Sequence, residues 1–233
     1  MTATFILITF SLFIIFSYFS FVLTSCDIND NSEIILAAKN NNSNILECMI
    51  QSKSNLDYTD VHGNTPLMWA SLKNNEVIVR KLIGNGALLD LQDKQGFTAI
   101  MKAVALDHDQ IVKILINQGA NIDIQNDDGF TALIIAIANN VSNGPLGCPN
   151  IIRDLIDKKA NLSIQSKFGK TALLMATSKN RVAIASILIE NSNINVLNIQ
   201  DKEGATSLMF AVSHKNTEIT KKIIEKVLPK YNR

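Results

Sequence analysis

Apolar residues recur three and four positions apart along most of the chain, in short segments separated by polar turns. One segment carries Val77, Ile78 and Leu82, and another carries Ile111 and Leu115. Residues at this spacing lie on one face of an α-helix, so each segment predicts an amphipathic helix. The pattern therefore predicts many short helices that bury their apolar faces in a common core, and these apolar residues are core positions rather than cofactor contacts.

A short motif that combines glycine, threonine and alanine recurs before and within alternate helices. Glycines permit the turn, threonine oxygens cap the helix start, and small alanines let neighbouring helices approach. Pro66 fits the first helical position, because that position needs no N–H. The motif residues are Gly63, Gly96, Gly129, Gly169 and Gly204, then Thr65, Thr98, Thr131, Thr171 and Thr206, and then Ala70, Ala103, Ala136, Ala176 and Ala211.

The first three glycines of the motif are 33 residues apart, and the next two follow after 40 and 35 residues. A period of about 33 residues with this G-x-T-P/A-L core resembles the ankyrin repeat. The resemblance implies an all-α repeat solenoid, in which each helix-turn-helix unit is joined to the next by a β-hairpin loop. Six units are expected, at 32–59, 60–92, 93–125, 126–165, 166–200 and 201–233. The first unit lacks the motif and is expected to be a cap, and the last is expected to close the stack with a polar face.

The N-terminal segment differs from the rest of the chain. Residues 1–26 contain no Asp, Glu, Lys or Arg, and residues 5–23 are almost entirely apolar. A run of this length, as a helix, can cross a bilayer, although it is long for a secretory signal and lacks a basic start. We therefore expect a hydrophobic N-terminal helix in residues 1–25, acting as a signal peptide or membrane anchor, and a linker in residues 26–31.

The end of this apolar run, Leu23-Thr24-Ser25-Cys26, resembles the lipobox of bacterial lipoproteins. The resemblance implies cleavage before Cys26 and lipidation of its thiol. The first basic residue is Lys39, and a lack of early positive charge favours translocation across the membrane. The expectation is a membrane-anchored lipoprotein that faces outward, on the cell-envelope or periplasmic side; an uncleaved transmembrane anchor and a secreted product are the alternatives.

The remaining chemistry argues against catalysis. The histidines, His62, His108 and His214, fall at non-equivalent positions of different units, which suggests neither a metal site nor a catalytic couple. Cys48 is expected to be a buried small hydrophobe, and Cys148 a free thiol in a loop. That loop, residues 141–150, holds the extra residues of the fourth unit, as a neutral insertion or as a protruding binding finger. We expect no enzyme, no metal and no cofactor.

Charge excludes another class of partner. The net charge is +1, and the 22 basic and 21 acidic residues are mixed along the chain. A nucleic-acid binder concentrates Lys and Arg on one face, so no nucleic-acid partner is expected. An enzyme or a small-ligand receptor remains the alternative of another class, and it would need a polar pocket with convergent titratable groups.

The ankyrin resemblance implies a protein-binding surface at the hairpin tips and on the adjoining ends of the inner helices. The chain is therefore expected to be a monomeric, non-catalytic interaction scaffold for an unknown protein, with a transmembrane adaptor or a host-directed effector as alternatives. The phenylalanines of this surface either anchor the partner or fold onto the next hairpin. The expected surface residues are His62, Asn64, Leu72, Lys73, Lys94, Gln95, Phe97, Leu106, Asp127, Asp128, Phe130, Lys167, Phe168 and Lys170.

Overall fold

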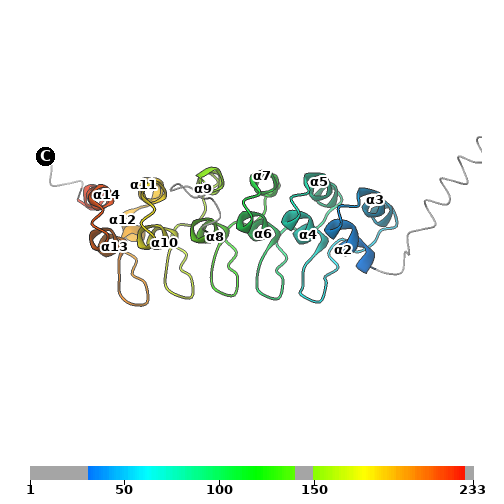
Figure 1. Ribbon diagram of the computed structural model, residues 1–233, viewed down its shortest axis with the longest axis horizontal. Helices are drawn as coiled ribbons and strands as arrows, with labels where there is room; N and C mark the ends of the chain where they lie inside the picture. The colour runs from blue at the N-terminus through cyan, green and yellow to red at the C-terminus, as the bar shows by residue number, and fades with distance from the viewer. Residues whose placement is uncertain (1–30, 140–148, 229–233) are drawn as a thin grey trace, which may run out of the picture.

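Pairs of helices are stacked side by side along one axis, and the loops between successive pairs all project to the same side (Figure 1). The structure is a computed structural model, and it describes residues 31–139 and 149–228. Within these ranges every regular element is a helix, and residues Gln200 and Thr206 form an isolated β-bridge in the last hairpin loop. The expected all-α solenoid is confirmed. The signal peptide or anchor in residues 1–25 and most of the 141–150 loop lie outside the described residues.

The helices form two rows. Each inner helix packs against the inner helices of the adjacent units, and the outer helices are arranged in the same way. A short extra helix, α12 (Ile194–Leu197), accounts for part of the longer fifth unit. The inner row is α2 (Ser32–Lys39), α4 (Pro66–Leu72), α6 (Ala99–Ala105), α8 (Ala132–Ala138), α10 (Ala172–Ser178) and α13 (Ser207–Ser213). The outer row is α3 (Ser43–Gln51), α5 (Glu76–Gly84), α7 (Asp109–Asn117), α9 (Pro149–Asp157), α11 (Val182–Asn191) and α14 (Thr217–Val227).

The repeated motif makes the helix starts that the sequence predicts. In each of the five motif-bearing units, the threonine is the N-cap of the inner helix and its side chain accepts a hydrogen bond from the backbone N–H three residues later. Pro66 is the first residue of α4. The turn between the two helices contains one left-handed residue, such as Asn74 or Asp107, with φ of 54° and 62°. Short polar side chains tolerate this conformation best. Nothing in the structure explains the Lys at position 215, which has φ of 55°.

From the second hairpin onward, successive hairpins are joined by a ladder of glutamines, Gln92, Gln125 and Gln165. The Gln92 amide donates to the carbonyl of Gly96 in its own hairpin, at 2.7 Å, and to the carbonyl of Gln125 in the next, at 2.9 Å. Gln125 and Gln165 make the same two bonds one and two units later. Each ladder residue thus satisfies a carbonyl in two units at once and fixes the distance between hairpins.

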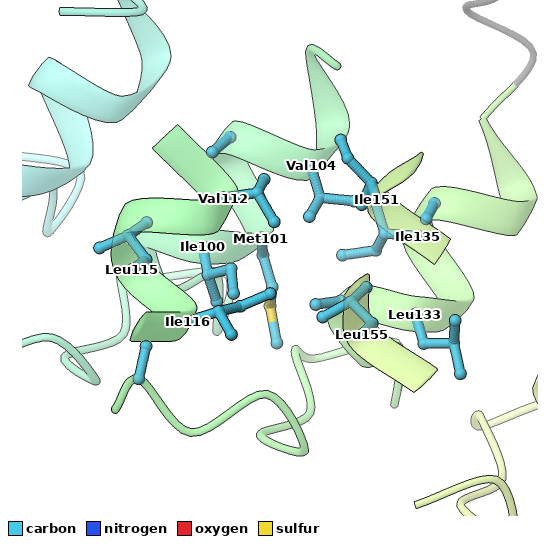
Figure 2. Packing of buried hydrophobic residues seen from close by; sticks show 14 of the residues in the cluster. Ile100, Met101, Val104, Val112, Leu115, Ile116, Leu133, Ile135, Ile151 and Leu155 are labelled. Carbon is cyan, nitrogen blue, oxygen red and sulfur yellow. The ribbon is translucent and has the colours of Figure 1, made fainter. Parts of the chain in front are cut away.

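The core runs through the stack as one continuous cluster, which includes the predicted Ile78 and Leu82. Figure 2 shows its middle, where Met101 and Val104 of α6 face α7, α8 and α9. Met101 and Val104 are each 1% exposed, because the next unit covers them. Val77, which was expected at a core position, is instead 56% exposed, because it faces away from the core on α5. Cys48, which was expected to be a buried small hydrophobe, is instead half-buried on α3 and disulfide-bonded.

The C-terminal end of the stack has the charged outer helix that the sequence led us to expect, but it also exposes apolar side chains that the sequence reasoning did not consider. The last helix α14 does expose charged side chains, including Lys221 and Glu225. Between them and beside them, however, Met209, Val212 and Ile224 are 56%, 57% and 41% exposed. The prediction concerned the charged residues of α14 and did not consider the inner helix α13, which packs against α10 and α14 in the described part of the chain.

Candidate protein-binding surface

The hairpin tips are held rigidly by one polar side chain in each loop. Asp93 Oδ1 accepts the backbone N–H groups of Gln95 and Phe97, at 2.9 and 2.8 Å. The same pair of bonds is made in the other hairpins by Asp60, Asn126, Ser166 and Asp201. Because these bonds are internal to each loop, the tip conformation is set before any partner arrives.

Backbone hydrogen bonds also join each tip to the next. The Lys94 N–H donates to the His62 carbonyl at 3.0 Å, and the Asp127 N–H donates to the Gln95 carbonyl at the same distance. The Lys167 N–H continues the series to Asp128 at 2.8 Å. The tips therefore form one ordered row along the side of the stack (Figure 1).

The predicted tip side chains are accessible in most cases. All of His62, Lys94, Gln95, Asp127, Asp128, Lys167 and Phe168 are exposed. On the inner helices and the residues that end them, Lys73 and Leu106 are exposed and Leu72 is half-buried. This row differs in charge and size from one unit to the next, although the backbone beneath it is the same, and variable side chains on a rigid frame can encode specificity.

Asn64 does not belong to this surface. It is 6% exposed, and its side-chain amide donates to the carboxylate of Asp60 at 3.2 and 3.3 Å. The expectation placed it with Phe97, Phe130 and Lys170, which occupy the same position of their units. Asn64 is shorter than those residues, so it turns inward to the loop carboxylate instead of reaching across the surface.

The phenylalanines follow both of the behaviours considered. Phe97 and Phe130 are half-buried. The ammonium group of Lys102 lies over the Phe97 ring, 5.4 Å from the ring centroid. The ring centroids of Phe130 and of Phe168 in the next hairpin are 6.4 Å apart. Phe168 itself is 58% exposed. The first two therefore serve mainly to fill the space between hairpin and inner helix, and Phe168 is the aromatic side chain that a partner can reach.

Trp69 and Phe210, which the sequence reasoning missed, extend this aromatic row. Both lie six residues after the motif glycine, on the inner-helix face next to the hairpins, so their shared register was the available signal. Lys39 lies over the Trp69 ring at 4.8 Å, and Lys170 lies over the Phe210 ring at 5.4 Å. Aromatic rings attract cations in this arrangement, which favours a preorganised surface.

Asp60 links this aromatic row to the first hairpin. Its Oδ2 accepts a hydrogen bond from the Trp69 indole N–H at 2.9 Å. Burial raises the pKa of the Asp60 carboxyl, but hydrogen bonds from Asn64, Trp69 and His62 lower it by more, so that the net pKa is below its usual value. Asp60 is therefore ionised and structural rather than a candidate general base.

Positive charge gathers in the fifth unit, at Lys167, Lys170 and Lys179. Burial lowers the pKa of Lys179, and the neighbouring charges of Arg181 and Lys170 lower it further. Its ammonium group donates to the carbonyl of Ala138 at 2.7 Å. A lysine whose pKa is lowered by other cations marks a local positive potential, which an anionic group of a partner would relieve.

Two of the three histidines, His108 and His214, make hydrogen bonds between units, and His62 is exposed at its hairpin tip. A ring nitrogen of His108 lies 2.8 Å from the Ser71 carbonyl, and one of His214 lies 3.1 Å from the Ser178 carbonyl, at the ends of the preceding inner helices. Across residues 31–139 and 149–228, no three His, Cys, Asp or Glu side chains lie close enough to hold a metal ion. Where the chain is described, no helix has the length and apolar character needed to cross a membrane.

Rigid hairpins with variable tips, carried on stacked helix pairs, define a solenoid interaction module. The family model for ankyrin repeats matches the chain three times, over residues 17–93, 72–146 and 141–232. These matches cover most of the chain, which therefore belongs to the ankyrin repeat family, a family that is typically non-catalytic and binds proteins. A search of curated proteins finds no match to the chain.

Proposed function

We propose that this chain is a non-catalytic scaffold that binds a protein segment across the hairpin tips of its fourth and fifth units, residues 126–165 and 166–200. The observation that carries the proposal is the exposed Phe168 ring beside Phe130. An exposed aromatic ring on a rigid loop can bury a large area at small entropic cost.

The charges around Phe168 indicate the chemistry of the partner. Lys167, Lys170 and Lys179 lie in the same unit as the ring, whereas Asp127 and Asp128 lie at the tip of the preceding hairpin. We expect a segment that inserts an apolar side chain against Phe168 and places an acidic group over the lysines. A basic group toward the two aspartates would fix the direction in which the segment lies.

Peptide selection tests this proposal. Peptides are selected from a random display library on the immobilised full chain, and the affinity of the selected peptides is measured for matched variants. We expect Phe168→Ala to weaken binding by about tenfold, because truncating an anchor costs more than about 1 kcal/mol. Val77→Ala is the control, since Val77 is 56% exposed on the outer helix α5.

A charge pair completes the design. Lys167→Glu is expected to abolish binding of the acidic peptides, and Lys158→Glu, the same change after the outer helix α9, is expected to leave it unchanged. Equal binding by the Phe168→Ala variant and the wild type, or selected peptides without any acidic residue, would overturn the proposal.

We further propose that the stack is held at a membrane by its N-terminal segment, as a lipoprotein modified at Cys26 that faces outward. The support is the uncharged apolar run in residues 5–23 and the lipobox-like Leu23-Thr24-Ser25-Cys26 that ends it. The disulfide bond at Cys48 agrees with an oxidising compartment outside the cytoplasm. An uncleaved transmembrane anchor is the alternative.

Mass spectrometry of the membrane fraction separates these possibilities. A product that begins at Cys26 and carries acyl chains supports lipidation, whereas an unmodified full-length chain contradicts it. Lipidation would consume the Cys26 thiol, and Cys148 directly precedes α9, which is separated from Cys48 on α3 by the outer helices α5 and α7. Lipidation at Cys26 and an intrachain disulfide at Cys48 therefore exclude one another. A peptide map without reduction is therefore a second test, because a Cys26–Cys48 disulfide excludes the lipid.

A further inference from the structure

The apolar side chains at the C-terminal end lie at positions that are buried in the other units. Met209 occupies the position of Met101, and Val212 occupies the position of Val104. Their exposed fractions are 56% and 57%, against 1% for each counterpart. These two positions face the next inner helix wherever a next unit exists. The end of the stack therefore presents a surface of the kind that the fold elsewhere covers.

Two other features at this end also differ from those at the boundaries between units, namely the hydrogen bonds of the glutamine and the space beside the motif glycine. In the part of the chain that is described, the Gln200 amide makes no bond that would continue the glutamine ladder. A Cβ atom added to Gly169 would lie 2.6 Å from the backbone nitrogen of Lys202, whereas one added to Gly204 would meet nothing within 4 Å. The space that a further hairpin would fill is open.

The end face has a defined shape and charge pattern. It forms an open groove of about 450 Å³, whose accessible lining is mostly apolar. Lys221 and Glu225 lie one helical turn apart on α14, with 3.8 Å between Nζ and Oε1. The lining residues are Val212, Lys215, Thr217, Thr220, Lys221, Ile224 and Glu225.

We propose that this face binds the same face of a second copy of the chain, in a tail-to-tail dimer with two-fold symmetry. An axis that passes midway between Lys221 and Glu225 places the two α14 helices antiparallel. Lys221 of each copy then lies beside Glu225 of the other, and the two Ile224 side chains pack near the axis. One face thus supplies both an apolar centre and complementary charges, as a two-fold interface requires.

The opposite end of the stack argues against head-to-tail association. There the outer helix α3 exposes Asn44, Glu47 and Gln51, and its large apolar side chains are at least partly buried. Although Leu36 of the inner helix α2 is 43% exposed, an open chain of copies would have to pack the apolar C-terminal face largely against the polar side chains of α3. A closed dimer avoids that cost, and it presents two hairpin rows to a partner, so that bivalent binding becomes possible.

Sedimentation of the full chain in detergent, at several protein concentrations, tests the dimer. We expect a reversible dimer whose dissociation constant rises by about tenfold or more in Val212→Lys, because a charge is placed in the apolar centre. Val77→Lys is the matched control, since Val77 and Val212 are 56% and 57% exposed, and it is expected to dimerise as the wild type does.

Charge reversal tests the symmetry. Lys221→Glu and Glu225→Lys are each expected to weaken the dimer, because each sets like charges against one another across the axis. The double variant exchanges the two charges in both copies and is expected to restore dimerisation. A monomer at all concentrations, open-ended assemblies, equal dimerisation by Val212→Lys and the wild type, or a double variant weaker than both single variants would overturn the proposal.

Discussion

The two ends of the stack are made from the same kind of helix pair, yet they expose side chains of different polarity to water. At the N-terminal end the outer helix presents Asn44 and Glu47, and the buried residues of α2 and α3 face inward. At the C-terminal end Met209 and Val212 keep the apolar character of internal positions, although they are 56% and 57% exposed in the described part of the chain. In a solenoid, a residue's environment depends on its place in the unit and also on whether a neighbouring unit follows.

Equivalent methionines provide the strongest test of this comparison. Met101→Ala should destabilise the chain by about 2–5 kcal/mol, because it opens a cavity between two units. Met209→Ala should cost less than about 0.5 kcal/mol at concentrations where copies of the chain are separate, since that side chain is already largely exposed. Urea denaturation of the two variants measures the difference in the free energy of unfolding. Equal losses would show that the internal position of Met101 and the terminal position of Met209 do not differ in solution.

Equivalent glycines give the next largest effect. Gly96 and Gly204 have φ of 78° and 79°, so an alanine at either position destabilises the folded state by about 1–2 kcal/mol, because the left-handed backbone strains its Cβ atom. At Gly96 the added Cβ would also lie 2.8 Å from Asn126 Cα, and overpacking adds about 1–3 kcal/mol. Thermal or urea unfolding should therefore show a larger loss for Gly96→Ala. If Gly204→Ala were as damaging, the last hairpin would have a neighbour after all.

Hydrogen exchange can compare the ends directly. Helices α13 and α14 leave Met209, Val212 and Ile224 exposed to water, so their amides should exchange about tenfold faster than those of α2 and α3, a difference of about 1.4 kcal/mol in opening free energy. The internal helix α6 should be the slowest of the helices compared. Faster exchange in α2 and α3 than in α13 and α14 would reverse the comparison.

The smallest expected effect concerns acid stability near the N-terminal end. The pKa of Asp60 is lowered in the folded protein, so the carboxylate contributes stability above about pH 4 and this contribution is lost as the pH falls through the folded pKa. Asp60→Asn should remove this dependence and keep the loop, because Asn126 has the same role in the fourth unit. Trp69, the single tryptophan, reports on the site by its fluorescence during a pH titration in urea. An unchanged acid transition in the variant would assign that transition to other carboxylates.

The sequence predicted the parts of the fold that depend on neighbours within one unit. Thr98 caps α6 and Gly96 is left-handed because of local bonding and local backbone geometry, and both follow from the motif. The hairpin tips were predicted for the same reason. The glutamine ladder went unnoticed, although Gln92 and Gln125 recur at the repeat spacing, because a polar residue in a loop gives no sign of the carbonyls it will reach.

The expectations that stayed open or proved incorrect concern contacts between units or between particular side chains. Phe97 and Phe130 share one position, yet their exposure was decided by Lys102 in one case and Phe168 in the other. Asn64 turned inward because an acceptor lay within reach of its short amide. The repeat register gives the position of a residue within its unit, but it does not identify the side chains with which that residue will make contact.

The glutamine ladder has a consequence for how such a chain can change over generations. Each rung bonds to backbone carbonyls, which every residue type provides, so a unit that carries the glutamine can be joined to a following hairpin of any sequence. A unit could be duplicated or lost by a single genetic event, and the glutamine amide would still form hydrogen bonds to the backbone carbonyls of its new neighbour. The number of units is thus open to selection, and the hairpin tips can diverge while the means of joining them is inherited unchanged.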